Sequence, residues 1–162
     1  MRAVLLALLS VSVLVFPAHA GAPRVRPLSN HVADLVQDAA ARSPTVARLL
    51  AAIEASDVIL QIDVRYELEV PRAMTHLVTS TADARYVRTV INRRMSPWQQ
   101  IELLAHELQH VVEIVEDPAV RDQKAMEARF ALLGWREGRG GAFETQAAIE
   151  AERQARRELS GQ

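Results

Sequence analysis

The chain has 162 residues, the length of a single domain. Its 19 basic and 20 acidic side chains leave a formal net charge of -1. This balance disfavours a nucleic-acid-binding protein, because such proteins carry a basic excess or a basic stripe. Cysteine is absent, which excludes disulfides, thiolate chemistry and cysteine-based zinc fingers.

Residues 1–20 have the pattern of a secretory signal peptide. Arg2 gives a positive start, residues 3–16 are uncharged and apolar, and Ala-His-Ala at 18–20 places small residues where a signal peptidase cleaves. The apolar run is shorter than the roughly 20 residues that a membrane-spanning helix needs. We therefore expect a mature chain that begins at Gly21, is secreted or periplasmic, and has no stable membrane insertion after signal cleavage.

Residues 21–42 predict an N-terminal leader followed by a first helix. Prolines at 23 and 27 favour an extended leader over 21–28, and Asn30 can cap a helix that runs to about Arg42. Ser43 and Pro44 mark the start of a second helix, because a capping residue is followed by proline at the first helical position. We assign residues 43–162 to the main domain.

The apolar residues then change from helical to alternating spacing. They alternate over 58–64 and again at 66, 68 and 70, and residues 75–81 and 86–92 are further strand candidates without glycine or proline. Helices are predicted over about 97–116, 120–133 and 142–159, with a glycine-rich loop over 134–141. The order of helices, strands and helices predicts an α+β fold, with a small antiparallel or mixed sheet covered by helices.

One motif with clear chemistry stands in the helix predicted after residue 96. Ser96 to Gln99 form a capping box with proline at the first helical position, which places His106-Glu107-Leu108-Gln109-His110 in the middle of the helix. At about 100° per residue, the two histidines share the side opposite the main apolar stripe. Since apolar residues also flank them, we expect the histidines to point into a cleft.

Two neutral imidazoles one helical turn apart can bind the same Zn²⁺ ion. Glu107 would lie beside that ion without ligating it, where it can take a proton from a water activated by the metal and later pass it to a leaving amine. The motif therefore predicts one zinc ion per chain, with His106 and His110 as ligands and Glu107 as the general base. The alternative is a surface helix that carries two histidines by chance.

Residues 103–110 resemble the active-site helix of zincin metallopeptidases, in particular small secreted bacterial gluzincin-like proteins. The resemblance extends over about 43–159 and implies a sheet whose edge strand, here residues 86–94, lies along the substrate cleft. It also implies that a later helix supplies a glutamate as the third zinc ligand. The longer metzincin pattern is absent, because residues 111–118 contain neither its glycine nor its third histidine.

Two glutamates compete for the position of third ligand. Glu144 follows the glycine-rich loop and, in the predicted helix, shares a face with four alanines, where an unpaired carboxylate is costly to bury; these are Ala147, Ala148, Ala151 and Ala155. Glu127 lies in the preceding predicted helix. The resemblance favours Glu144, which stands in an aromatic-Glu-Thr setting. However, the acidic residue that gluzincins often carry shortly after this glutamate is missing, because alanines stand at 147 and 148.

These inferences predict an exported zinc-dependent peptidase with a small zincin-like domain, acting on a peptide or protein substrate and not on nucleic acid. The second hypothesis is a degenerate zincin-fold protein that binds metal or a partner without significant turnover. The missing acidic residue favours it, as does the absence of a clear donor to a tetrahedral oxyanion. Tyr86 is a candidate for that donor.

Overall fold

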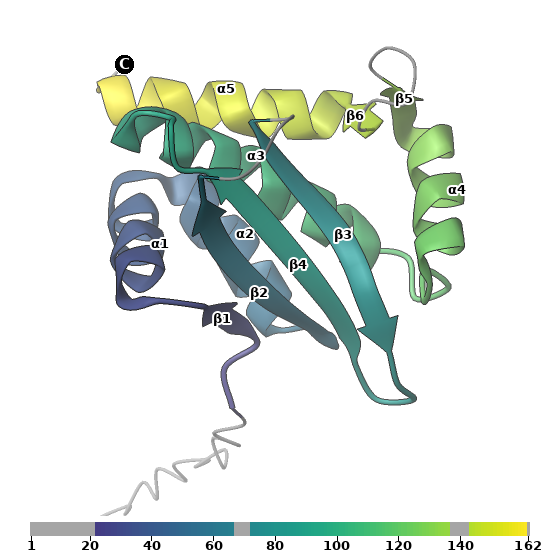
Figure 1. Cartoon of the computed structure of the whole chain (residues 1–162). Coiled ribbons are helices and arrows are strands. Elements are labelled where there is room, and N and C mark those ends of the chain that lie inside the picture. The colour runs from purple at the N-terminus through teal and green to yellow at the C-terminus, as the bar shows by residue number, and fades with distance from the viewer. Residues whose placement is uncertain (1–21, 67–71, 137–142, 162) are drawn as a thin grey trace, which may run out of the picture.

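The computed structural model describes residues 22–66, 72–136 and 143–161. The predicted signal peptide, Gly21 and the alternating positions 68 and 70 lie outside these ranges. Within the described ranges the chain forms five helices and six strands. Figure 1 shows the larger sheet in front of the central helix α3, with α5 crossing the top. No helix in these ranges is both long enough and apolar enough to cross a membrane.

The two N-terminal helices begin at serine caps. In α1 (Asn30–Arg42) the capping residue is Ser29, whose hydroxyl accepts from the Val32 amide, and not Asn30 as predicted. In α2 (Pro44–Glu54) Ser43 is the cap and Pro44 the first residue, which confirms the predicted start. The leader before α1 contributes β1 (Val25–Pro27).

The α+β prediction is confirmed, and the larger sheet is mixed. It contains β1, β2 (Val58–Arg65), β3 (Ala73–Ser80) and β4 (Arg85–Asn92), in the order β1-β2-β4-β3. The strands β1, β2 and β4 run parallel, and β3 is antiparallel to β4. The expectation that residues 86–94 form an edge strand is wrong, because β4 lies between β2 and β3, and β3 is the edge.

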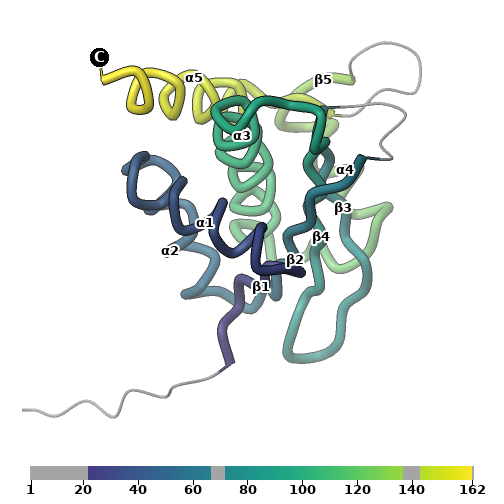
Figure 2. The backbone as a smooth tube through the Cα atoms, turned by 60° about the vertical axis from the view of Figure 1, so that its left-hand side comes forward, coloured from purple at the N-terminus to yellow at the C-terminus, as the bar shows by residue number. Residues whose placement is uncertain are grey.

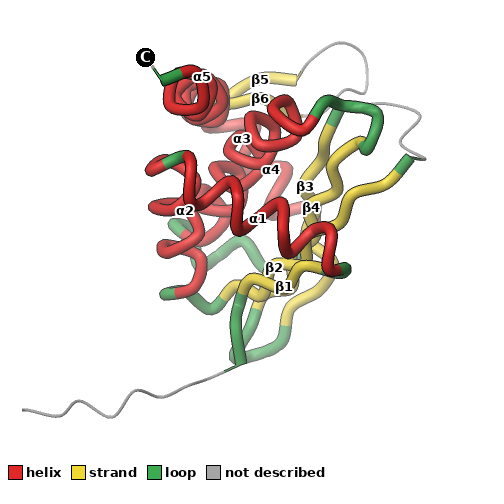
Figure 3. The backbone as a smooth tube through the Cα atoms, turned by 90° about the vertical axis from the view of Figure 1, so that its left-hand side faces the viewer, coloured by secondary structure: helices red, strands yellow, loops and turns green. Residues whose placement is uncertain are grey.

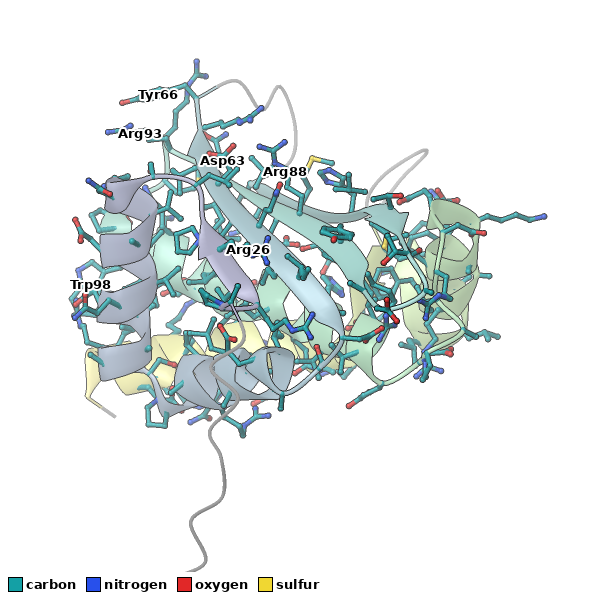
Figure 4. All side chains as sticks on the ribbon, turned by 90° about the horizontal axis from the view of Figure 1, so that it is seen from below. Arg26, Asp63, Tyr66, Arg88, Arg93 and Trp98 are labelled. Carbon is teal, nitrogen blue, oxygen red and sulfur yellow. The ribbon has the colours of Figure 1, made fainter. Side chains whose placement is uncertain are left out.

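Several side chains labelled in Figure 4 pair with one another on β2 and β4 and just after these strands. Asp63 of β2 accepts hydrogen bonds from Arg65 and, at 3.2 Å, from Arg88 of β4. The guanidinium of Arg93 lies 5.1 Å from the centre of the Tyr66 ring. These contacts hold the side chains in place on the surface. None of these residues lines the cleft beside the histidine motif that is described below.

The helix that carries the motif is α3 (Pro97–Val115), and it begins with the predicted capping box between Ser96 and Gln99. Figure 2 shows α3 between the sheet and the α1–α2 pair, with α5 across one end, and Figure 3 shows the helices gathered on one side of the sheet. Because α3 has neighbours on several sides, most of its side chains are buried, including both histidines.

A buried arginine holds the C-terminal end of α3. Arg85, at the start of β4, is only 1% exposed. Its guanidinium donates to the Asp57 carboxylate and to carbonyl oxygens in and after the last turn of α3, those of Ile114, Val115, Asp117 and Val120. The last carbonyls of a helix lack partners within the helix, so these bonds fix α3 relative to the sheet.

The C-terminal region differs from the prediction at two points. The helix α4 (Gln123–Leu133) begins after an Asp122 cap and not near residue 120. A loop and the start of a helix were predicted over 134–145. The described residues of this segment instead form two short paired strands, β5 (Gly134–Arg136) and β6 (Phe143–Thr145). The last helix, α5 (Gln146–Ser160), begins only after them. A Cβ atom at Gly134 would lie 1.8 Å from the Glu144 carbonyl oxygen, so this close pairing requires glycine.

Candidate metal centre

The structure brings together three of the predicted site residues. One ligand atom each from His106, His110 and Glu144 lies within 4.8 Å of the others. His106 Nε2 is 3.3 Å from Glu144 Oε2, and the two imidazole rings meet edge to face with their centres 4.9 Å apart. The histidines are 7% and 5% exposed. This largely buried group could bind a metal ion.

Glu144 reaches the histidines by a route that the sequence did not indicate. It lies on β6, paired with Trp135 of β5, and not on the alanine face of a helix. Ala147, predicted to share its face, is exposed, while the buried alanines of α5 belong to the core: Ala148, Ala151 and Ala155. The helix-face argument for Glu144 is therefore wrong, although the residue stands in the group.

The alternative third ligand, Glu127, and the candidate oxyanion donor, Tyr86, lie elsewhere. The Glu127 side chain on α4 is 45% exposed and accepts hydrogen bonds from Gln123 and Arg136. Tyr86 lies on the interior strand β4 and does not line the cleft beside the histidines. Neither residue joins the group of potential ligands.

The second nitrogen of each histidine faces a carboxylate. His110 Nδ1 lies 2.8 Å from Glu113 Oε2, and the Thr145 hydroxyl donates to the other oxygen of Glu113 at 2.6 Å. His106 Nδ1 lies 3.3 Å from Glu152 Oε2, at an angle that falls short of a hydrogen bond. Metal-binding histidines ordinarily donate this N–H to a carboxylate, which fixes the tautomer and directs the other nitrogen to the ion.

Glu113 and Glu152 are functional candidates that sequence reasoning missed. Glu113 had a usable signal, because a residue three positions after His110 shares its helix face. Glu152 had none, since it comes from α5 and meets His106 only in the folded chain. It lies about one turn beyond the alanines at 147 and 148, where the expected acidic residue was missing.

Negative charge is in excess around the two imidazoles. Glu107, Glu113, Glu144 and Glu152 all lie at or beside them, and Glu107 is 5% exposed. Burial raises the pKa of Glu107 above its ordinary value, although both histidines oppose this shift. Burial disfavours the charged His106 ring, but contacts with Glu144 and Glu152 outweigh it and raise the pKa of His106 to about 10. Two of these carboxylates, Glu107 and Glu113, are buried, and a buried carboxylate is stabilised by a nearby cation, which a protonated His106 or a metal ion can supply.

A cleft of about 310 Å³ opens onto this group. It is lined by residues of α3, by Glu144, by the residues that begin β3 and by one face of α5: Arg72, Ala73, Leu103, His106, Glu107, Glu144, Ile149, Glu152, Arg153 and Arg156. Of the two histidines only His106 lines it, contrary to the expectation for His110, whose ring lies 5.1 Å from that of Phe130. A larger hollow of about 480 Å³ over α4 and β5 is lined by none of the three potential ligands.

The chain was compared with known families, proteins and structures. No family model matches it, and no curated protein or solved structure matches it either.

Proposed function

We propose that this chain is an exported zinc-dependent peptidase. The observation that carries the proposal is the group of His106, His110 and Glu144, whose ligand atoms lie within 4.8 Å of one another beside a cleft. Two imidazoles and one carboxylate are a ligand set of catalytic zinc sites, in which three protein ligands leave a position open. The four carboxylates around the histidines, two of them buried, also fit a divalent cation.

The remaining residues have separate tasks in this proposal. Bound zinc would supply a Lewis acid that polarises a peptide carbonyl and lowers the pKa of water. Glu107 lines the cleft next to His106, so its carboxylate can accept a proton from the attacking water and return it to the leaving amine nitrogen. Glu113 is hydrogen-bonded to His110 Nδ1 and would keep its Nε2 directed toward the site. Glu152 lies 3.3 Å from His106 Nδ1 and can take the same role once a hydrogen bond forms there.

The cleft also suits an extended chain. Ala73, the first residue of β3, lines it, and β3 has only β4 as a partner among the described strands. The free edge of such a strand can pair with an extended peptide through backbone hydrogen bonds.

Metal binding without turnover is the second candidate. It is favoured by the lining of the cleft, in which the described residues include no tyrosine and no histidine other than His106. Tyr86, considered as a donor to the oxyanion, is absent from that lining. Among the described side chains of the lining, the guanidinium groups of Arg72, Arg153 and Arg156 could serve there.

Zinc titration and peptide hydrolysis of three variants test the proposal. Glu107→Gln should keep zinc and lose about 10²–10⁴-fold in rate, because it removes a general base. Glu144→Ala should lose both zinc affinity and activity, because it removes a ligand. Glu127→Ala is the matched control and should change neither.

The outcomes separate the hypotheses. If Glu127→Ala releases zinc while Glu144→Ala retains it, the ligand assignment is wrong. If the wild type holds one zinc per chain but cleaves no peptide in a diverse mixture, the second candidate replaces the first. The export part has its own measurement, since the intact mass of exported protein should correspond to a chain that begins at Gly21.

A further inference from the structure

Three arginines line the same cleft as the potential metal ligands. Arg72 immediately precedes β3, whereas Arg153 and Arg156 lie on α5. Positions 149, 152, 153 and 156 of α5 recur at helical spacing, so one face of this helix borders the cleft. Since the whole chain has a net charge of -1, this concentration of guanidinium groups is a local property of the cleft.

Contacts within the cleft neutralise these arginines unequally. Arg156 donates to Glu102 at 2.8 Å and to Glu152 at 3.1 Å, so its charge is compensated. Arg72 is 60% exposed, and its one ion pair with the described residues is a long one, 3.9 Å to Glu152. Arg153 is exposed and forms no ion pair with the described residues.

The glutamates of the cleft have other partners. Glu144 and Glu152 both contact His106, and Glu107 is buried beside it. When a cation is bound, Glu144 would be one of its ligands. Among the described residues, Arg153 therefore has no anionic partner and Arg72 has only the long pair with Glu152, so both guanidinium groups can meet an anion that enters the cleft.

We propose that Arg72 and Arg153 bind a carboxylate group of the peptide substrate, close to the bond that is cleaved. This inference rests on the proposed peptidase function. A single carboxylate, that of Glu152, separates Arg72 from His106, and an extended peptide advances about 3.3 Å per residue. Counting the widths of the carboxylate and the imidazole ring and a metal–nitrogen bond of about 2 Å, the bound carboxylate therefore lies within about four residues of the cleaved bond. Guanidinium groups suit this task because they form paired, charge-assisted hydrogen bonds with carboxylates.

Matched peptides test the inference on the zinc-loaded protein. Sites cleaved in a diverse peptide mixture are mapped first, and synthetic peptides are then compared in two arms. One arm replaces a nearby Glu by Gln, and the other replaces the free C-terminal carboxylate by an amide. We expect one carboxylate source to raise kcat/KM by about tenfold, and the arm that responds identifies the source.

Arginine variants assign this preference to the cleft. Arg153→Gln and Arg72→Gln should each reduce the preference for the carboxylate, and Arg153→Glu should reverse it. Arg153→Lys should retain part of it, because the charge remains while the paired geometry is lost. Arg157→Gln is the matched control, since Arg157 is on α5 but pairs with exposed Glu150 and does not line the cleft. Circular dichroism and zinc content verify that each variant is folded and loaded.

A binding measurement separates this inference from the peptidase proposal. Calorimetric titration of the same peptides into Glu107→Gln protein, with and without Zn²⁺, reports affinity without cleavage. Arg153-dependent binding of the carboxylate peptides, without any hydrolysis by the wild type, supports the carboxylate site and contradicts the peptidase. Hydrolysis with no preference for a carboxylate, or a preference that survives in Arg153→Gln and Arg72→Gln, overturns the inference and leaves the peptidase standing.

Discussion

Replacing Arg85 by methionine tests how the motif helix is held in place. The two side chains are similar in length, so the substitution removes mainly the charge and the donors. The Arg85 guanidinium bonds Asp57 at 2.6–3.1 Å and also caps the C-terminal end of α3. A cation at this end of a helix also interacts favourably with the helix dipole.

The expected loss follows from the groups that remain without a donor. The hydrogen bonds to the carbonyls of Ile114 and Val120 are buried. The Ile114 carbonyl keeps the Asp117 amide as a donor, so the main loss is at Val120, since a buried acceptor without a donor costs about 1–3 kcal/mol. Asp57 is 36% exposed, so water can solvate its carboxylate and the lost pair adds little. We expect a loss of about 2 kcal/mol in the free energy of unfolding, or a fall in Tm of about 7 °C for a domain of this size.

Urea unfolding followed by circular dichroism measures this loss. The experiment is done with a chelator present, so that metal binding does not contribute to the free energy of unfolding. Arg157→Met is the control, because its ion pair with Glu150 is about half exposed on both sides and should change stability by less than about 0.5 kcal/mol. A loss below about 1 kcal/mol in Arg85→Met would refute the assignment of Arg85 as the cap of α3.

The remaining predictions concern zinc binding and the loss of stability at acidic pH. Chelation should lower the Tm of zinc-loaded protein by calorimetry, because zinc binds only the folded site; an unchanged Tm contradicts the site. Glu113→Gln should weaken zinc binding about 10–100-fold in a competition titration, whereas exposed Glu116→Gln should not; equal affinities would remove Glu113 from the site. The hydrogen bond from Arg85 lowers the pKa of Asp57 in the folded protein. The ionised Asp57 therefore contributes fully to stability above its unfolded pKa of about 3.9. This contribution is lost as the pH falls through the lower folded pKa. Unfolding free energies in acid should therefore depend less on pH in Arg85→Met, and identical slopes contradict this.

Features that depend on neighbouring residues were predictable from the sequence. Ser43 and Pro44 start α2, and the capping box at Ser96 starts α3, because a cap satisfies free amides within its own first turn. The position of the histidine pair on one side of α3 follows from helical periodicity alone. For the same reason the α+β class and the strands β2, β3 and β4 could be predicted from alternation and spacing.

Tertiary contacts alone decided how the site is completed. Glu144 meets the histidines because β5 pairs with β6 and Gly134 admits the Glu144 backbone, and a pairing between separate segments leaves no periodic pattern in the sequence. Glu152 faces His106 only because α5 packs across α3. The sequence by itself determined that the two histidines lie one turn apart on the same side of a helix. The partners of those histidines depend on which surfaces of distant elements are buried together, and this is a property of the folded chain as a whole.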